Sequence, residues 1–166
     1  MNDKTHNVLF LCTGNSARSI MAEAILNVLG KGRFKAYSAG SLPSGQVQPM
    51  ARELAEAIGY DASLVRSKSW DEFSGEGAPE MDIVITVCDN AAGEACPLWL
   101  GHPALAHWGV PDPVAATGDE GARRHAYTAA FATLRLRIEL LLSLPLQSLD
   151  RLAAQTKLRD IGAVGL

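Results

Sequence analysis

The chain lacks a hydrophobic run long enough to cross a membrane. Its most apolar stretches, such as residues 83–87, are far shorter than the roughly 20 residues of a transmembrane helix. The first seven residues are polar and show none of the apolar segment of a secretory signal peptide. These features predict a cytoplasmic protein with no membrane partner.

A surplus of basic residues is also missing. The 166 residues contain 15 Lys and Arg against 18 Asp and Glu, which gives a formal net charge of -3. Because proteins that bind nucleic acid usually carry a basic surplus, no nucleic-acid partner is expected. The hydrophobic fraction of 48% and the charged fraction of 20% are typical of a globular domain and exclude a disordered or fibrous chain.

Cysteines are few, with three in the whole chain. An odd number cannot form a framework of permanent disulfides without leaving one thiol over. In the reducing cytoplasm, cysteines are more often reactive or buried thiols than structural crosslinks. The sequence therefore points to thiol chemistry or burial at these three positions.

Strand-like and helix-like segments alternate along the chain. Short apolar runs at residues 8–11, 34–38 and 81–87 predict strands, and a fourth strand is expected to begin at His107-Trp108. Amphipathic patterns predict helices over residues 18–29, 49–58 and 119–144. This order is typical of an α/β fold with a parallel sheet. We expect one domain over residues 1–146 and a C-terminal helical tail over residues 147–166, with a solvated helix face at Arg123, Arg124, Arg135 and Arg137.

The segment between the first strand and the first helix has the features of an anion-binding loop. Cys12 ends the strand and Arg18 begins the helix. Gly14 and Asn15 are residue types that readily adopt positive φ, which a tight loop requires. The loop N–H groups, the helix N-terminus and the Arg18 guanidinium suit a tetrahedral oxyanion and should lower the pKa of the Cys12 thiol. The alternative is a buried cysteine that ends a core strand, with Arg18 on the surface.

The sequence Cys12-Thr-Gly-Asn-Ser-Ala-Arg18-Ser19 resembles the phosphate-binding loop of low-molecular-weight protein tyrosine phosphatases. It is still more similar to the arsenate reductases built on that fold, and Ser38-Ala39-Gly40 and Asp112-Pro113 also stand where that family has them. The resemblance covers about residues 7–144. It implies a three-layer α/β/α fold with a four-stranded parallel sheet. It also implies oxyanion binding by Thr13, Gly14, Asn15, Ser16, Ala17, Arg18 and Ser19.

Asp112 lies between two prolines that restrict its backbone. The resemblance implies that Asp112 is the general acid that protonates the leaving oxygen. The alternative is an ordinary turn aspartate. Phosphatases of this family usually have tyrosines after the Asp-Pro pair, whereas Val114 follows here. This departure favours a small inorganic substrate over phosphotyrosine.

Two further cysteines separate a reductase from a phosphatase, because a phosphatase needs only one thiol. Cys88 directly follows the strand at 81–87, and parallel strands end at one edge of the sheet, so Cys88 is expected near Cys12. The resemblance to three-cysteine arsenate reductases implies that Cys12 attacks arsenate, Cys88 attacks Cys12 and Cys96 attacks Cys88. It implies thioredoxin, or glutaredoxin with glutathione, as the reductant, and phosphate or sulfate as competing oxyanions.

Other interpretations of these residues stay open. The protein could be a phosphatase of the same fold, or an oxyanion-binding module without turnover. Cys88 could be a core thiol and Cys96 incidental. A zinc site could be formed by Cys88, Cys96, His102 and His107, although the Cys-x7-Cys spacing is wider than that of usual structural zinc sites.

The resemblance also implies a monovalent cation near the loop, although no tightly bound cofactor is expected. Asn15, Glu23 and Ser38 match positions that hold potassium in some arsenate reductases of this family. Oxygen ligands suit such an ion. The alternative is that Glu23 faces solvent or caps the loop.

Overall fold

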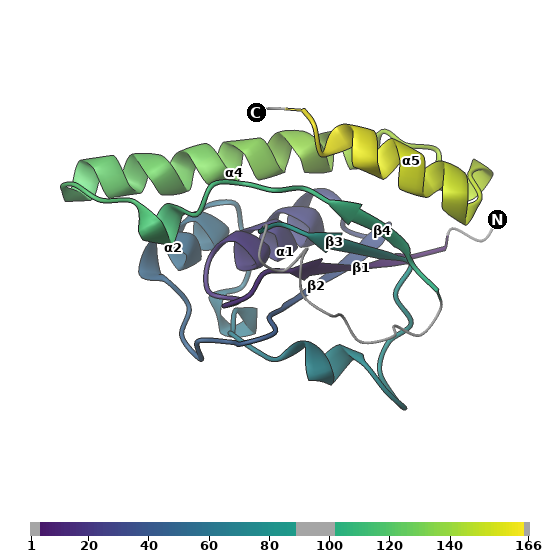
Figure 1. Cartoon of the computed structure of the whole chain (residues 1–166), viewed down its shortest axis with the longest axis horizontal. Coiled ribbons are helices and arrows are strands. Elements are labelled where there is room, and N and C mark those ends of the chain that lie inside the picture. Colours follow the sequence, from purple (N-terminus) through teal and green to yellow (C-terminus); the bar gives the residue numbers. More distant parts are fainter. Residues whose placement is uncertain (1–3, 89–101, 165–166) are drawn as a thin grey trace.

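The computed structural model describes residues 4–88 and 102–164. Its centre is a four-stranded sheet with the order β2-β1-β3-β4 (Figure 1). All neighbouring strands are parallel. The strands are β1 (His6–Leu11), β2 (Phe34–Ala39), β3 (Ile83–Thr86) and β4 (Ala104–His107). Their carboxyl ends therefore lie at one edge of the sheet, where ligands bind in folds of this type.

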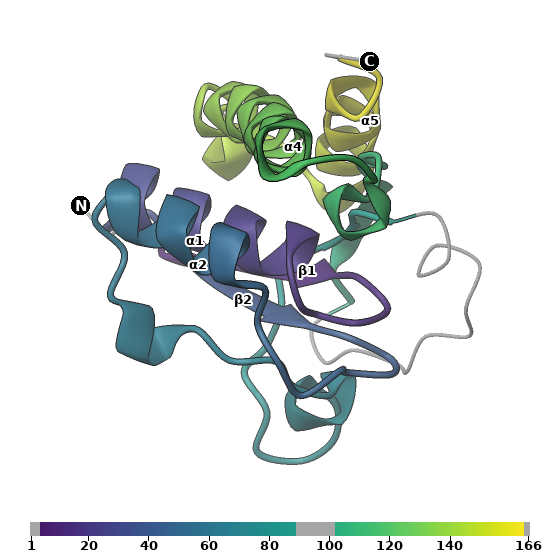
Figure 2. The ribbon, with the colours of Figure 1, turned by 90° about the vertical axis from the view of Figure 1, so that its left-hand side faces the viewer.

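Helices cover one face of this sheet. They are α1 (Arg18–Leu29), α2 (Pro49–Ala57), α4 (Glu120–Leu142) and α5 (Arg151–Ile161). Figure 2 shows α4 and α5 at the top of the view, with α1 and α2 below α4. Short 3-10 helices lie at η1 (Ala62–Leu64), η2 (Trp70–Phe73), η3 (Pro113–Ala115) and η4 (Leu146–Ser148).

The strands are apolar on both faces because both faces are covered. Val8 and Phe10 of β1 point into the larger core, which α1, α4 and α5 complete. Leu9 and Leu11 point to the opposite face and pack with Phe73 of η2. The predicted α/β fold with a four-stranded parallel sheet is confirmed.

Most predicted elements lie where the sequence placed them, but the fourth strand does not. It was expected to begin at His107-Trp108, whereas β4 ends at His107. Trp108 is instead fully buried, and its Nε1–H donates to the Leu158 carbonyl at 2.8 Å. The sequence Ala-Leu-Ala-His has no β-branched residue, so pairing with β3 rather than local propensity decides that it is a strand.

The predicted tail and the predicted solvated arginine face meet in the same region. Helix α5 packs against β4 and α4, and Leu158 is fully buried. Arg137 is also fully buried, which corrects the expected exposure of this side chain. Its Nε donates to the Val164 carbonyl at 2.9 Å and its Nη1 to the Gly109 carbonyl at 3.1 Å. The C-terminal segment covers Arg137, and helix periodicity alone could not reveal this.

The described residues include no helix that is long and apolar enough to cross a lipid bilayer.

Candidate active site

The loop from Cys12 to Ala17 connects β1 to α1. The segment of residues 40–48, which follows β2, donates hydrogen bonds to the carbonyl groups of this loop. The N–H groups of Leu42 and Ser44 donate to the carbonyls of Thr13 and Gly14, each at 3.0 Å, and the Gln48 N–H donates to the Ser16 carbonyl at 2.9 Å. These bonds fix the orientation of the loop peptides.

Gly40 allows the segment of residues 40–48 to lie close to the backbone of the loop. A Cβ atom at Gly40 would lie 2.3 Å from the Thr13 carbonyl oxygen and 2.7 Å from that of Cys12. Both oxygens belong to backbone, which cannot move aside cheaply. The glycine of Ser38-Ala39-Gly40 is therefore required by the close contact with the loop.

Asn15 has the positive φ of 44° that the loop was expected to contain, whereas Gly14 does not have positive φ. The Asn15 side chain is fully buried and holds this conformation through two hydrogen bonds. Its Nδ2 donates to Ser19 Oγ at 2.7 Å, and its Oδ1 accepts the Lys68 backbone N–H at 2.9 Å. The strained residue is thus fixed by a segment distant in the sequence.

The inner donors of the loop are available for an anion. Among the described residues, the backbone N–H groups of residues 14–18 have no hydrogen-bond acceptor. Helix α1 begins at Arg18 without a side-chain cap and without an acidic residue in its first turn. Converging N–H groups at a helix N-terminus favour a bound oxyanion.

Arg18 and Asp112 lie together at this site. Arg18 Nη1 donates to the Val110 carbonyl at 2.9 Å, and Arg18 Nη2 lies 3.5 Å from Asp112 Oδ2. The other oxygen of Asp112 accepts the Val114 N–H at 3.0 Å and caps η3. The Asp112 side chain keeps 40% of its surface exposed. It is therefore accessible to solvent while it faces the guanidinium.

The sulfurs of Cys12 and Cys88 meet beneath the loop. Both residues are buried, and Cys88 lies close enough to Cys12 to be the largest influence on the pKa of its thiol. The Thr13 N–H donates to Cys88 Sγ at 3.3 Å, and Thr13 Oγ1 lies 3.7 Å from it. The structure thus brings together two cysteines from the ends of β1 and β3.

This contact changes the acidity that the sequence predicted for Cys12. The hydrogen bond with Cys88 and then burial raise the pKa of the Cys12 thiol above its ordinary value, while Arg18 acts to lower it. The predicted lowering of this pKa is therefore wrong for the anion-free arrangement. The prediction considered Arg18 and the helix N-terminus but not a second sulfur in contact.

Cys96 lies outside the described residues, so its part in a disulfide cascade stays a prediction. Among the residues that the structure describes, no group of three or more His, Cys, Asp and Glu side chains could hold a metal ion.

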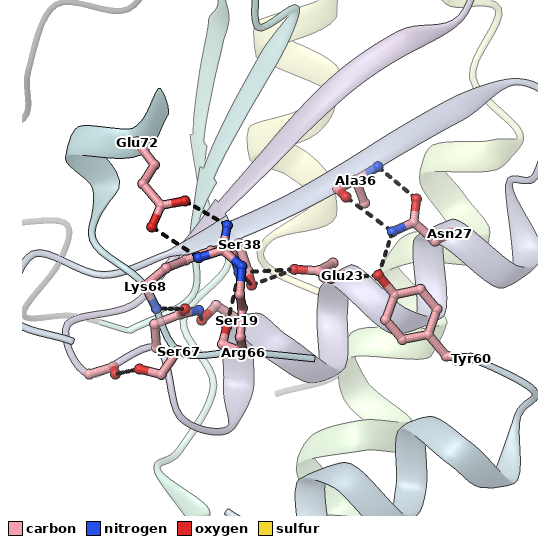
Figure 3. Close-up of polar contacts among 12 residues, drawn as sticks. Ser19, Glu23, Asn27, Ala36, Ser38, Tyr60, Arg66, Ser67, Lys68 and Glu72 are labelled. Atoms are coloured by element: carbon pink, nitrogen blue, oxygen red, sulfur yellow. Dashed lines mark hydrogen bonds and ion pairs between the residues drawn. The ribbon is translucent and has the colours of Figure 1, made fainter. Parts of the chain in front are cut away.

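The three residues predicted to hold potassium do lie together, but they surround a lysine. Ser38 Oγ donates to Glu23 Oε1 at 2.6 Å, and Lys68 Nζ lies 3.5 Å from the same carboxylate oxygen (Figure 3). Glu23 is buried and does not face solvent. Sequence reasoning missed Lys68 because an isolated lysine between two serines usually lies on the surface.

Comparison with known proteins agrees with this site. The model of the family described as low molecular weight phosphotyrosine protein phosphatase matches residues 7–155. The chain therefore belongs to the low molecular weight phosphotyrosine protein phosphatase family. The predicted family is confirmed.

Several similar proteins within this family are arsenate reductases. The chain is 36% identical to the arsenate reductase of Bacillus subtilis, over 68% of this chain and 78% of that protein. It is 34% identical to arsenate reductase 1 of Staphylococcus epidermidis, over 83% of this chain and the whole of that protein. A solved structure described as an arsenate reductase in the phosphate binding state superposes with a TM-score of 0.66 and 27% identity, covering 84% of this chain and 98% of that one. These relatives favour the arsenate reductase interpretation over the phosphatase alternative.

Proposed function

We propose that this protein is an arsenate reductase that converts arsenate to arsenite through a cysteine nucleophile and an internal disulfide cascade. The observation that carries the proposal is the position of Cys88, which lies beside Cys12 and accepts the Thr13 N–H of the loop at 3.3 Å. A phosphatase has no use for a second sulfur at this position, whereas a reductase needs one to supply electrons.

In the first step, arsenate lies on the N–H groups of residues 14–18 and on the Arg18 guanidinium. Cys12 Sγ attacks arsenic, a sulfur–arsenic bond forms and one arsenic–oxygen bond breaks. Asp112 gives its proton to the leaving oxygen, which departs as water. The 3.5 Å contact between Arg18 and Asp112 supports this assignment because it holds the acid beside the anion.

In the second step, Cys88 Sγ attacks Cys12 Sγ. A disulfide forms between the two residues and the sulfur–arsenic bond breaks, with its electron pair remaining on arsenic. Arsenite leaves, so arsenic gains two electrons and the two thiols lose them. The N–H of Thr13 favours negative charge on Cys88 Sγ, which is the attacking atom of this step.

In the third step, Cys96 attacks Cys88 and Cys12 departs as a thiolate. The resulting Cys88–Cys96 disulfide takes two electrons from a dithiol protein, thioredoxin, or from glutaredoxin with glutathione. Phosphate and sulfate compete with arsenate because they are tetrahedral oxyanions of similar size. The proposal places the protein in the cytoplasm, where such reductants keep thiols reduced.

The test is turnover of purified protein with arsenate and a thioredoxin or a glutaredoxin system, and separately with an aryl phosphate. We expect arsenate-dependent consumption of the reductant. Cys88→Ser and Cys96→Ser should each abolish repeated turnover. Mapping of thiols after one turnover should find a Cys88–Cys96 disulfide in the wild-type protein.

The alternatives give different results in the same assays. A phosphatase would hydrolyse the aryl phosphate and be indifferent to loss of either downstream cysteine. A binding module would gain thermal stability with sulfate or arsenate and turn nothing over. Normal cycling of the Cys88→Ser protein on arsenate would contradict the proposed cascade.

A further inference from the structure

Behind the oxyanion loop lies a buried lysine whose three N–H donors face three oxygens. Only 7% of the Lys68 side chain is exposed. Its Nζ lies 3.0 Å from the Arg66 carbonyl, 3.3 Å from Ser38 Oγ and 3.5 Å from Glu23 Oε1 (Figure 3). An ammonium group has three donors and no acceptor, so this set satisfies it completely.

Both oxygens of the partner carboxylate are engaged by hydroxyl donors. Glu23 Oε1 accepts from the Ser38 hydroxyl and Glu23 Oε2 accepts from the Tyr60 hydroxyl, each at 2.6 Å. Burial lowers the pKa of Lys68, and Glu23 opposes that shift. The pair is therefore an ion pair whose members depend on each other.

The other basic side chain in this region, Arg66, already pairs with another carboxylate. Arg66 donates through both terminal nitrogens to the two oxygens of Glu72, at 2.9 and 2.6 Å. This pair is exposed, whereas Glu23 and Lys68 are buried. Of the two basic side chains, Lys68 is thus the one that neutralises Glu23.

The oxygens predicted to hold potassium do not fit a metal ion in this arrangement. Glu23 Oε1 and Ser38 Oγ face the ammonium, and Asn15 Oδ1 accepts the Lys68 backbone N–H. One residue therefore engages all three predicted ligands. A potassium ion added among them would lie against a buried positive charge, which the Coulomb repulsion in a poorly solvated site disfavours.

We propose that Lys68 is a positioning residue, a built-in cation that replaces a monovalent metal ion in fixing the oxyanion loop. Its ammonium joins the end of β2 to α1 through Ser38 and Glu23, and its backbone holds Asn15 in the left-handed conformation of the loop. Lys68 touches neither the oxyanion nor the sulfurs in this assignment. Oxyanion binding and stability in this protein are then independent of the monovalent cation in solution.

The first test compares wild-type protein in potassium, sodium and tetramethylammonium chloride at equal ionic strength. We expect equal melting temperatures and equal affinities for sulfate, measured by calorimetry, in all three salts. A melting temperature or sulfate affinity that rises in potassium but not in tetramethylammonium would overturn the proposal.

The second test removes the ammonium and leaves room for an ion. Lys68→Ala leaves the buried Glu23 carboxylate without its counter-ion, so the melting temperature should fall by about 10 °C in tetramethylammonium chloride. Potassium should restore several degrees and tighten sulfate binding at least about threefold. An Ala variant with the same melting temperature and sulfate affinity in both salts contradicts the assignment. If the variant does not fold in tetramethylammonium, refolding in potassium is expected, and failure in both salts counts against the proposal.

Two control variants separate charge from packing. Lys68→Met fills the same space without charge, so it should lose stability with no recovery in potassium. The double variant Lys68→Met with Glu23→Gln lacks both buried charges and should be more stable than Lys68→Met alone, again with no preference among cations. A cation-specific response in either control would contradict the proposal. Because the readouts are melting temperature and sulfate affinity, this inference and the arsenate reductase proposal can fail separately.

Discussion

The two sides of the loop from Cys12 to Ala17 differ in how their polar groups are satisfied. On the sulfur side, the N–H groups of residues 14–18 have no acceptor among the described residues, and Arg18 meets the half-exposed Asp112. On the opposite side, Lys68 and Glu23 are buried and hydrogen-bonded within the protein. The first side is suited to receive an anion from solvent, and the second is suited to hold the loop in one shape. Substitutions on the first side should therefore change binding and turnover most, and substitutions on the second should change stability most, with smaller effects on binding through the shape of the loop.

The largest effect is expected for Cys12→Ala on the sulfur side. Removal of the nucleophile should lower arsenate turnover at least about 10^4-fold, because the other groups of the site cannot replace the attacking atom. Sulfate binding should persist, since the N–H groups and Arg18 remain. A coupled assay of reductant consumption measures the first effect and calorimetry the second. Turnover near the wild-type rate would remove Cys12 from the mechanism.

Asp112→Asn should lower turnover roughly 10^2–10^4-fold, because the amide cannot donate a proton to the leaving oxygen. Sulfate affinity should stay the same or increase, since a negative charge beside the anion is removed. Asp119→Asn is the matched control, because Asp119 caps α4 through the Ala122 N–H and an asparagine can do the same. An equal loss in both variants would show that Asp112 is only a structural cap.

Arg18→Lys should weaken sulfate binding roughly 10- to 100-fold, since a hydrogen bond to a charged group contributes about 1.5–3 kcal/mol and lysine lacks the planar fork. Calorimetric titration with sulfate measures the change. Arg135→Lys on α4, where Arg135 pairs with Glu139 in solvent, serves as control and should leave the affinity unchanged. Unchanged binding in Arg18→Lys would place the anion elsewhere.

Cys88→Ala tests the contact between the two sulfurs by its effect on acidity. The hydrogen bond with Cys88 is the main cause of the raised pKa of Cys12, so its loss should lower that pKa. A lower pKa means more Cys12 thiolate at a given pH. Alkylation of Cys12 by iodoacetamide in anion-free protein should therefore become several-fold faster, and its pH profile should move to lower pH. Cys88→Ser, which keeps a hydrogen-bonding group, should shift the profile less; an unchanged profile in Cys88→Ala argues against the contact.

The smallest effect is expected on the opposite side, for Tyr60→Phe. This change removes the hydroxyl that donates to Glu23 Oε2 and accepts from Asn27 Nδ2. The free energy of unfolding should fall by about 1 kcal/mol, which corresponds to roughly 2–4 °C in melting temperature. Sulfate affinity should stay unchanged. A large loss of sulfate binding with little loss of stability would break the division between the two sides.

Local patterns in the sequence were sufficient to predict the strand, the loop and the helix that form the site. Helix α1 spans the residues that its apolar spacing predicts, and Asn15 adopts the positive φ expected of the loop. The order of strands and helices also predicted the parallel sheet, and with it the meeting of Cys12 and Cys88 at one edge. These features depend on near neighbours in the chain and on general rules of α/β topology.

Only the tertiary structure decided which charged side chains are buried and what they neutralise. Nothing in the sequence next to Lys68 or Arg137 indicates that these charged side chains are buried. Both are nevertheless buried by segments distant along the chain. The strand β4, the raised pKa of Cys12 and the lysine among the predicted potassium ligands likewise result from long-range contacts. The charge state and role of a side chain depend on the atoms that surround it, and those atoms come together only when the whole chain has packed.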